Sequence, residues 1–146
     1  LSERSLNIVT NSIDVACILA KTDNQVICSG GLLQGTHMCF VGPETQAFFS
    51  KIEVDIAFMG ASGIRLGAGF TTSSPLQYDT KRAIMASAKK KYVLMDISKL
   101  HSSHLYVFSD FSEIDAIITN APKSDSEAEE ILCALESVGV NVIRVL

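Results

Sequence analysis

The residues best suited to chemistry in this sequence are small polar side chains and glycines that follow short apolar runs. Thr10, Asn11 and Ser12 stand where a β-branched run gives way to a helical pattern. An oxygen of Asn11 or Ser12 can cap that helix by accepting a hydrogen bond from a free backbone N–H, and the same N–H groups can bind a phosphate. Gly30 and Gly31 follow the next apolar run, and they suit either a plain turn or a close backbone approach to a ligand.

A stretch rich in glycine, serine and threonine covers residues 60–74, and we predict a long loop there. Gly60, Ser62 and Gly63 lie at its start, and Thr71 and Thr72 lie near its end. Loops longer than about 12 residues with no structure of their own are uncommon in compact domains and are often functional. The sequence therefore marks this stretch as a candidate binding segment.

Positive charge follows the two threonines. Lys81 and Arg82 supply it, and hydroxyls beside cations suit a polyhydroxylated anion. A flexible loop followed by a surface helix explains the same residues, so both interpretations stay open. Asp96 and Lys99 close a further predicted strand. They form either a surface ion pair of little energetic value or a ligand pair, in which Lys99 holds a phosphate and Asp96 a sugar hydroxyl.

Metal and catalytic motifs are missing from the sequence. His37, His101 and His104 fall into no metal-binding pattern, and we expect the last two to be loop residues. There is no G-x-S-x-G, no Walker loop and no G-x-G-x-x-G after a strand. We therefore predict no catalytic residues, no metal site and no cofactor.

The cysteines also lack a chemical pattern. Cys17, Cys28, Cys39 and Cys133 include no C-x-x-C pair, and each lies in an apolar run. A free thiol in such a run behaves as a small hydrophobic side chain. We expect four reduced core residues, as in a reducing cytoplasm.

Composition indicates one compact domain over residues 1–146, in which 47% of residues are hydrophobic and 19% charged. No apolar run reaches the roughly 18 residues of a membrane span, and the polar Leu1–Arg4 has no signal-peptide pattern, so we expect a cytoplasmic location. A net charge of −4 disfavours direct binding to nucleic acid. We expect the basic Lys89–Lys91 to lie at the solvated end of a helix.

Short apolar strands alternate with helical patterns along the chain. We predict strands at 6–10, 25–29, 55–59, 91–96, 105–108, 116–119 and 140–146, and helices at 13–21, 43–51, 78–90 and 126–138. This alternation is typical of an α/β fold, here a three-layer open, mostly parallel sheet with helices on both faces. Ligands of such sheets bind at the carboxyl ends of the strands, where the polar residues above are found.

A series of short motifs occurs in a fixed order. They are Val9–Ser12, Ser29–Gly31, Phe40–Pro43, Asp55–Ile64, Gly69–Thr72, Lys81–Met85, Asp96–Lys99 and Ile114–Asn120. This string resembles the C-terminal sensor domain of DeoR-family bacterial transcriptional regulators. The resemblance implies a fold similar to ribose-5-phosphate isomerase and coenzyme A transferases. It also implies a bound sugar phosphate or polyol phosphate, homo-oligomers, and DNA binding only through a separate N-terminal helix-turn-helix.

The chain departs from this family pattern in two places. Relatives carry a phosphate loop and its helix just before the strand matched by 6–10, and we expect that loop and the helix-turn-helix to lie outside this chain. Ser62 stands where many relatives have a polar or acidic residue, often aspartate. The ligand hydroxyl read at that position is therefore expected to differ.

Three functions compete on these observations. The first is an effector sensor that shifts an oligomer between DNA-bound and released states. The second is a sugar-phosphate isomerase that uses Asp96 with Lys81 or Lys99, although the acidic residues of such enzymes are missing after the third strand. The third is an oligomerisation domain that has lost its ligand. The resemblance favours the sensor.

Overall fold

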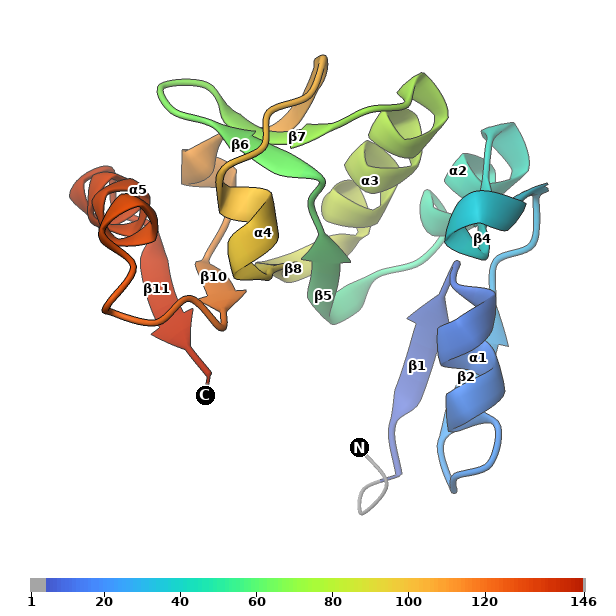
Figure 1. Cartoon of the computed structure of the whole chain (residues 1–146). Helices are drawn as coiled ribbons and strands as arrows, with labels where there is room; N and C mark the ends of the chain where they lie inside the picture. The colour runs from blue at the N-terminus through green and yellow to red at the C-terminus, as the bar shows by residue number, and fades with distance from the viewer. Residues whose placement is uncertain (1–4, 146) are drawn as a thin grey trace. The chain divides into compact units, whose positions relative to one another are not determined.

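The computed structural model describes residues 5–145, so the polar start predicted at Leu1–Arg4 lies outside the described residues. The chain divides into two compact units, Leu1–Ile52 and Glu53–Leu146 (Figure 1), and each is described by itself. The predicted α/β class with a mostly parallel sheet flanked by helices is confirmed and is consistent with a three-layer fold. The prediction of one sensing domain over 1–146 concerns the joint function of the two units and stays a prediction.

The first unit begins with a parallel β–α–β motif and continues with a small antiparallel hairpin. The parallel strands are β1 (Asn7–Thr10) and β2 (Gln25–Cys28), joined by helix α1 (Ile13–Leu19). The hairpin strands are β3 (Leu32–Gln34) and β4 (Cys39–Val41), joined by the short 3-10 helix η1 (Gly35–His37) and followed by helix α2 (Pro43–Phe49). The sequence predicted the parallel motif and α2 but missed the hairpin, because strands of three residues are too short to show a period.

A four-stranded parallel sheet forms the centre of the second unit, in the order β11-β10-β8-β5. Its strands are β5 (Val54–Gly60), β8 (Ala88–Met95), β10 (Ala116–Thr119) and β11 (Asn141–Arg144). The long helices of this unit are α3 (Pro75–Ser87) and α5 (Ser126–Ser137). Residues of both helices, such as Met85 and Leu132, belong to one core cluster with buried residues of the sheet.

Burial along the strands agrees with this arrangement. Alternate residues such as Met59, Val93 and Ile117 are buried, and they belong to one core cluster with Leu132 and Leu135 of α5. The residues between them, whose side chains point to the other face of the sheet, are more exposed to solvent. Ile56, Phe58, Leu94 and Ile143 are exposed, and the ring of Phe58 stacks on Tyr92 with centroids 5.5 Å apart.

The predicted loop at 60–74 is wrong: most of it belongs to a second, antiparallel sheet. Its strands are β6 (Gly63–Arg65), β7 (Gly69–Thr72) and β9 (Tyr106–Ser109), in the order β6-β7-β9. Gly69 shows why a strand of this sheet contains glycine. Its φ is 144°, and a Cβ at this position would overlap the carbonyl oxygen of Ser109 on β9. The glycines therefore permit close pairing and a tight turn, and they do not signal an unstructured segment.

Two further predictions are corrected by the structure. Lys89–Lys91 lies inside strand β8, because α3 ends at Ser87, before the basic run. Lys89 pairs there with Glu53 and Asp55 at 3.1 and 3.2 Å. Of the four cysteines predicted to be core residues, Cys39 is buried, while Cys17, Cys28 and Cys133 are exposed. Apolar neighbours such as Ile18 and Ile27 are exposed as well, so an apolar run in the sequence does not establish burial.

Candidate functional site

The polar residues after β1 form a local hydrogen-bonded turn. Ser12 Oγ accepts a hydrogen bond from the N–H of Val15 at 3.3 Å and caps α1, as predicted for this position. Thr10 Oγ1 accepts from the N–H of Ser12 at 3.0 Å, and Asn11 Nδ2 donates to the Phe40 carbonyl at 2.9 Å. All three side chains are half-buried. The capping interpretation is therefore supported for Ser12, and the phosphate interpretation stays a prediction.

Gly30 and Gly31 lie beside this turn, because the N–H of Ser29 donates to the Thr10 carbonyl at 3.0 Å. Both glycines have positive φ, 67° and 120°. The Gly30 carbonyl accepts a hydrogen bond from Thr45 Oγ1 at 2.8 Å, and a Cβ on Gly31 would overlap the same hydroxyl. Gly31 thus lets the chain pack closely on α2, whereas the space around Gly30 is open within 4 Å.

Lys81 places a positive charge at the end of a parallel strand in the second unit. It lies on α3, and its Nζ donates to the carbonyl of Gly60, at the carboxyl end of β5, at 2.6 Å. The same Nζ sits 5.2 Å from the ring centroid of Phe108, within the range of a cation–π contact. These contacts place a positive charge at the edge of the sheet where ligands of parallel sheets bind.

The residues around Ser62 are tied to the antiparallel sheet. The N–H of Ser62 donates to the Thr71 carbonyl at 2.9 Å, and Thr71 Oγ1 accepts from the N–H of His104 at 3.1 Å. A Cβ on Gly63 would overlap the carbonyl of Ser102, so this glycine allows close contact with the segment after α4 (Ile97–Leu100). Thr71 and Thr72 are buried, and the Thr71 hydroxyl already accepts a hydrogen bond. Their predicted ligand role receives no structural support beyond proximity.

Asp96 and Lys99 lie at the end of the neighbouring strand, β8. Asp96 caps α4 and accepts from the N–H of Ser98 at 2.8 Å. Hydrogen bonds from the Ser98 side chain and backbone hold the pKa of Asp96 below its ordinary value, so it is an ionised acceptor at neutral pH. Lys99 is exposed on α4, and among the residues the structure describes no ion pair joins it to Asp96.

Sequence reasoning missed Asn120, which follows β10 directly. Its Oδ1 accepts a hydrogen bond from the N–H of Ile97 at 3.0 Å and so joins the ends of β8 and β10. The signal was present, because an exposed asparagine directly after an apolar run is the same pattern that marked the other strand ends.

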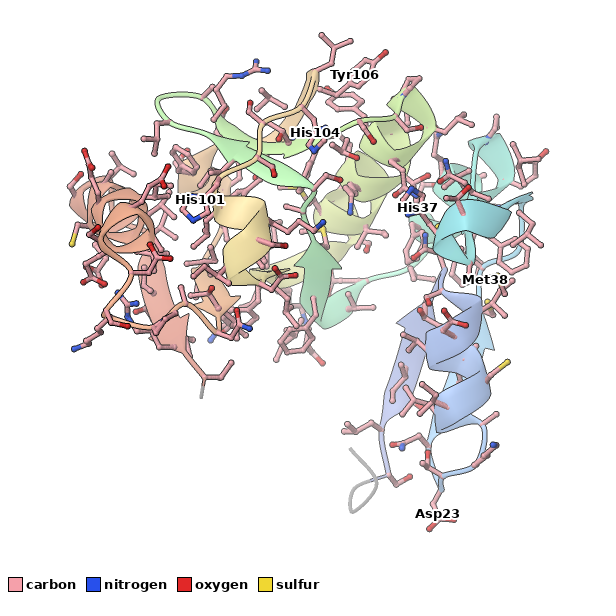
Figure 2. All side chains as sticks on the ribbon, viewed as in Figure 1. Asp23, His37, Met38, His101, His104 and Tyr106 are labelled. Atoms are coloured by element: carbon pink, nitrogen blue, oxygen red, sulfur yellow. The ribbon has the colours of Figure 1, made fainter. Side chains whose placement is uncertain are left out.

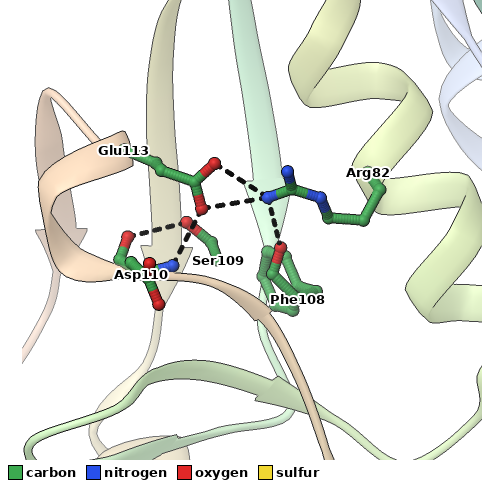
Figure 3. Close-up of polar contacts among 5 residues, drawn as sticks. All are labelled: Arg82, Phe108, Ser109, Asp110 and Glu113. Atoms are coloured by element: carbon green, nitrogen blue, oxygen red, sulfur yellow. Dashed lines mark hydrogen bonds and ion pairs between the residues drawn. The ribbon is translucent and has the colours of Figure 1, made fainter.

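Arg82, the second cation of the predicted pair, points to a different set of partners. Figure 3 shows its Nη1 donating to both carboxylate oxygens of Glu113, at 2.8 and 2.9 Å, and to the Phe108 carbonyl at 3.2 Å. Glu113 ends the short 3-10 helix η2 (Phe111–Glu113), and its carboxylate also accepts a hydrogen bond from the N–H of Asp110, the N-cap residue of that helix. The hydrogen bond to Glu113 raises the pKa of Arg82. Arg82 is thus a structural link between α3 and η2.

Two further features of the second unit lie away from these strand ends. An open polar hollow of about 310 Å³ is lined by Lys89, Lys91 and residues 112–115, beside the amino-terminal half of β8. Lys89 pairs there with Glu53 and Asp55, and the Asp115 carboxylate accepts from the backbone N–H of Lys91 at 2.7 Å. His101 lies 3.3 Å from Glu127, and His104 lies on the segment after α4, as Figure 2 shows. Within residues 5–145 no group of side chains could hold a metal ion.

Comparison with known proteins decides the family. The family model described as the DeoR C-terminal sensor domain matches residues 1–121. This chain belongs to that family. It is 31% identical over 141 residues to the transcriptional regulator IolR of Bacillus subtilis and 32% identical over 135 residues to the regulator GlpR of Haloferax volcanii. It is 30% identical over 123 residues to the glycerol-3-phosphate regulon repressor of Escherichia coli.

The three alignments cover most of this chain but only part of each relative. They span 95%, 92% and 84% of the chain and 55%, 51% and 49% of the respective relatives. The sensor domain therefore corresponds to about half the length of the curated relatives it matches. No helix in residues 5–145 is long and apolar enough to cross a membrane.

Proposed function

We propose that this sensor domain binds a phosphorylated sugar or polyol at the carboxyl ends of its parallel strands and thereby regulates a transcriptional repressor of sugar metabolism. The observation that carries the proposal is the position of Lys81, whose ammonium group is held at the end of β5 by the Gly60 carbonyl. In a family of sensor domains, a fixed cation at the ligand-binding edge of a parallel sheet favours an anionic effector.

The strand ends offer groups for both parts of such an effector. Lys81 and the exposed Lys99 can hold a phosphate, and the ionised Asp96 can accept hydrogen bonds from sugar hydroxyls. One relative is named a repressor of the glycerol-3-phosphate regulon and another a repressor of a lactose phosphotransferase system. The first name contains a polyol phosphate and the second a sugar, which supports this ligand class for the present domain.

The effector would act through the other parts of the regulator. Binding that favours one of two arrangements shifts the population between them, and by linkage it alters operator affinity to the same extent. We propose that DNA is bound only by a separate helix-turn-helix, that the sensor domain forms homo-oligomers, and that the protein works in the cytoplasm. The net charge of −4 agrees with DNA binding by a separate domain, because the phosphate backbone of DNA binds cationic surfaces.

An isomerase activity receives less support from the same geometry. A general base works best with a pKa near the operating pH. The pKa of Asp96 is instead lowered by its hydrogen bonds to Ser98, which makes it a weaker base. The curated relatives described above are regulators, so we propose a sensor without catalytic activity.

A thermal-shift titration of the full-length protein tests the proposal. The probes are glycerol 3-phosphate, ribose 5-phosphate and glucose 6-phosphate, with inorganic phosphate as the reference. A ligand that binds only the native state must raise the melting temperature. We expect at least one probe to do so, and we expect Lys81→Gln to weaken it by about tenfold, the loss typical of one charge-assisted hydrogen bond.

The matched control is Lys21→Gln, a similar loss of charge just after α1, which should leave the titration unchanged. No shift with any probe at millimolar concentration would contradict the proposed function. Equal losses in the two lysine variants would show that only the overall charge matters and that Lys81 has no special position.

A further inference from the structure

We propose that Asn120 reads the effector directly, with its Nδ2 donating to a hydroxyl or phosphate oxygen while its Oδ1 stays bound to the N–H of Ile97. The inference rests on the proposed function and adds a specificity-determining residue to that site. Asn120 ends the motif Ile114–Asn120, but the motif gives it no role; the position of β10 beside β8 in the sheet does.

Topology brings Asn120 to the candidate site. β10 pairs with β8 in parallel, and Thr119 is the partner of Met95. The next residues, Asn120 and Asp96, therefore leave the sheet from neighbouring strands, which lie about 4.8 Å apart. Asn120 thus occupies the same edge as the acceptor Asp96, on the side of β8 opposite to β5.

One hydrogen bond fixes the orientation of the Asn120 carboxamide. Because Oδ1 accepts from the N–H of Ile97 at 3.0 Å, Nδ2 is the other branch of the same planar group. Asn120 is exposed, and within residues 5–145 no acceptor is paired with its Nδ2. A donor is therefore held in a set direction at the edge of the sheet without further ordering of the side chain.

The chemistry of the two strand ends is complementary. Asp96 is an ionised carboxylate and can only accept hydrogen bonds, whereas the outer branch of Asn120 can only donate. Neighbouring hydroxyls of a sugar or polyol can donate to Asp96 and accept from Asn120. An anion without hydroxyls has no hydrogen to donate to Asp96, so the two residues together favour the polyol. This pair selects a polyhydroxylated ligand, while the lysines select its phosphate.

Asn120→Asp in the full-length protein separates the two roles of this side chain. The carboxylate keeps an acceptor for the N–H of Ile97 and has the same shape, but it replaces the outer donor with a charged acceptor. We expect the melting temperature without ligand to stay near that of the wild type. We expect the affinity for whichever of the three sugar phosphates binds the wild type to fall by at least about tenfold.

Asn141→Asp is the matched control, because Asn141 is exposed at the amino end of β11, at the opposite edge of the same sheet. It adds the same charge and should leave the affinity unchanged. Repeating both titrations at high salt, which screens distant charges, should preserve the loss in Asn120→Asp. Asn120→Ala removes the acceptor as well and should lower both melting temperature and affinity.

The possible outcomes differ for the inference and for the proposed function. If no sugar phosphate stabilises the wild type, the proposed function fails and the inference fails with it. If the wild type binds but Asn120→Asp binds equally well, or loses no more than Asn141→Asp, Asn120 only joins β8 to β10 and the inference is wrong.

Discussion

The chain uses the same β–α–β motif in both units, with different results for packing. In the first unit α1 joins the parallel strands β1 and β2, and in the second α5 joins β10 and β11. Both helices begin with a side-chain cap, from Ser12 and Asp125. Yet α1 buries Leu19 alone and leaves Ile18 67% exposed, whereas α5 buries Ala128, Ile131, Leu132 and Leu135.

The difference comes from what each helix packs against. β1 and β2 form a sheet of two strands, while β10 and β11 belong to the sheet of four. A pair of strands offers too narrow a surface to bury a helix face. Local sequence therefore sets the helices and their caps, but the width of the sheet decides how much apolar surface a helix removes from water. We expect the second unit to carry most of the stability.

The largest expected effect is the loss of a core side chain from α5. Leu132 is fully buried, and Leu132→Ala should lower the free energy of unfolding by about 3 kcal/mol, through lost transfer energy and the cavity left behind. Leu19→Ala, the matched change in α1, should cost less. Urea unfolding measures both. Equal costs would show that α1 is packed as tightly as α5.

Replacing a glycine of positive φ by alanine should have the next largest effect on stability. Gly69→Ala in β7 forces a side chain into a φ of 144° and against the Ser109 carbonyl, and strain of this kind costs about 1–3 kcal/mol. Gly31→Ala in the first unit also has a positive φ, of 120°, but the atom its Cβ would overlap is the side-chain hydroxyl of Thr45, and the nearest backbone atom, the Val41 carbonyl oxygen, is 3.0 Å away. We expect Gly69→Ala to be more destabilising in thermal unfolding. Gly67→Ala, with positive φ and open space, isolates the contribution of φ, and the comparison fails if it costs as much as Gly69→Ala.

The two helix caps should differ by a smaller amount. Asp125 accepts from the N–H of Ala128 at 2.9 Å, while the corresponding bond of Ser12 is 3.3 Å. Asp125→Ala should cost about 1 kcal/mol, as is usual for a cap, and Ser12→Ala somewhat less. Thermal unfolding tests the order. A cost for Ser12→Ala equal to or larger than that for Asp125→Ala would contradict the expected order.

Much of the fold follows from the sequence, because the parallel strands and long helices have strong patterns. The predicted strands at 55–59 and 116–119 and the helix at 126–138 agree with β5, β10 and α5 within a few residues. The candidate site was predicted at the strand ends, because apolar runs end where the chain leaves the sheet, and its ligand role stays a prediction. Lys81 beside Gly60 fits that expectation.

The remainder depends on contacts between distant segments, which a local pattern does not show. The strand at 69–72 is the centre of a small sheet, because β9 pairs with it on one side and the strand at 63–65 pairs with it on the other. Likewise, Arg82 looks equivalent to Lys81 in the sequence, but its partner Glu113 is 31 residues away. Asn120 follows an apolar run and could have been noted as a strand end, but its hydrogen bond to Ile97 appears only when β8 and β10 are paired.

The smallest expected effect concerns Glu113 and the loss of unfolding free energy at acidic pH. Partial burial raises the pKa of Glu113, but hydrogen bonds from Arg82 and from the N–H of Asp110 hold it below its ordinary value of 4.5 overall. The folded state therefore gains stability above pH 4.5 that it loses as the pH falls through the lower, folded pKa. The Arg82 and Glu113 side chains are 43% and 35% exposed, so solvent limits the effect to less than about 1 kcal/mol.

Glu113→Gln removes this titration, so its unfolding free energy should fall less steeply with acid below pH 4.5 than that of the wild type. Glu130→Gln, on the exposed side of α5, should keep the wild-type slope. Urea unfolding at a series of pH values measures all three proteins. If the Glu113→Gln curve runs parallel to the wild type, the carboxylate contributes no linked stability. Arg82 would then tie α3 mainly to β9, through its hydrogen bond to the Phe108 carbonyl, and its ion pair with Glu113 would add no stability.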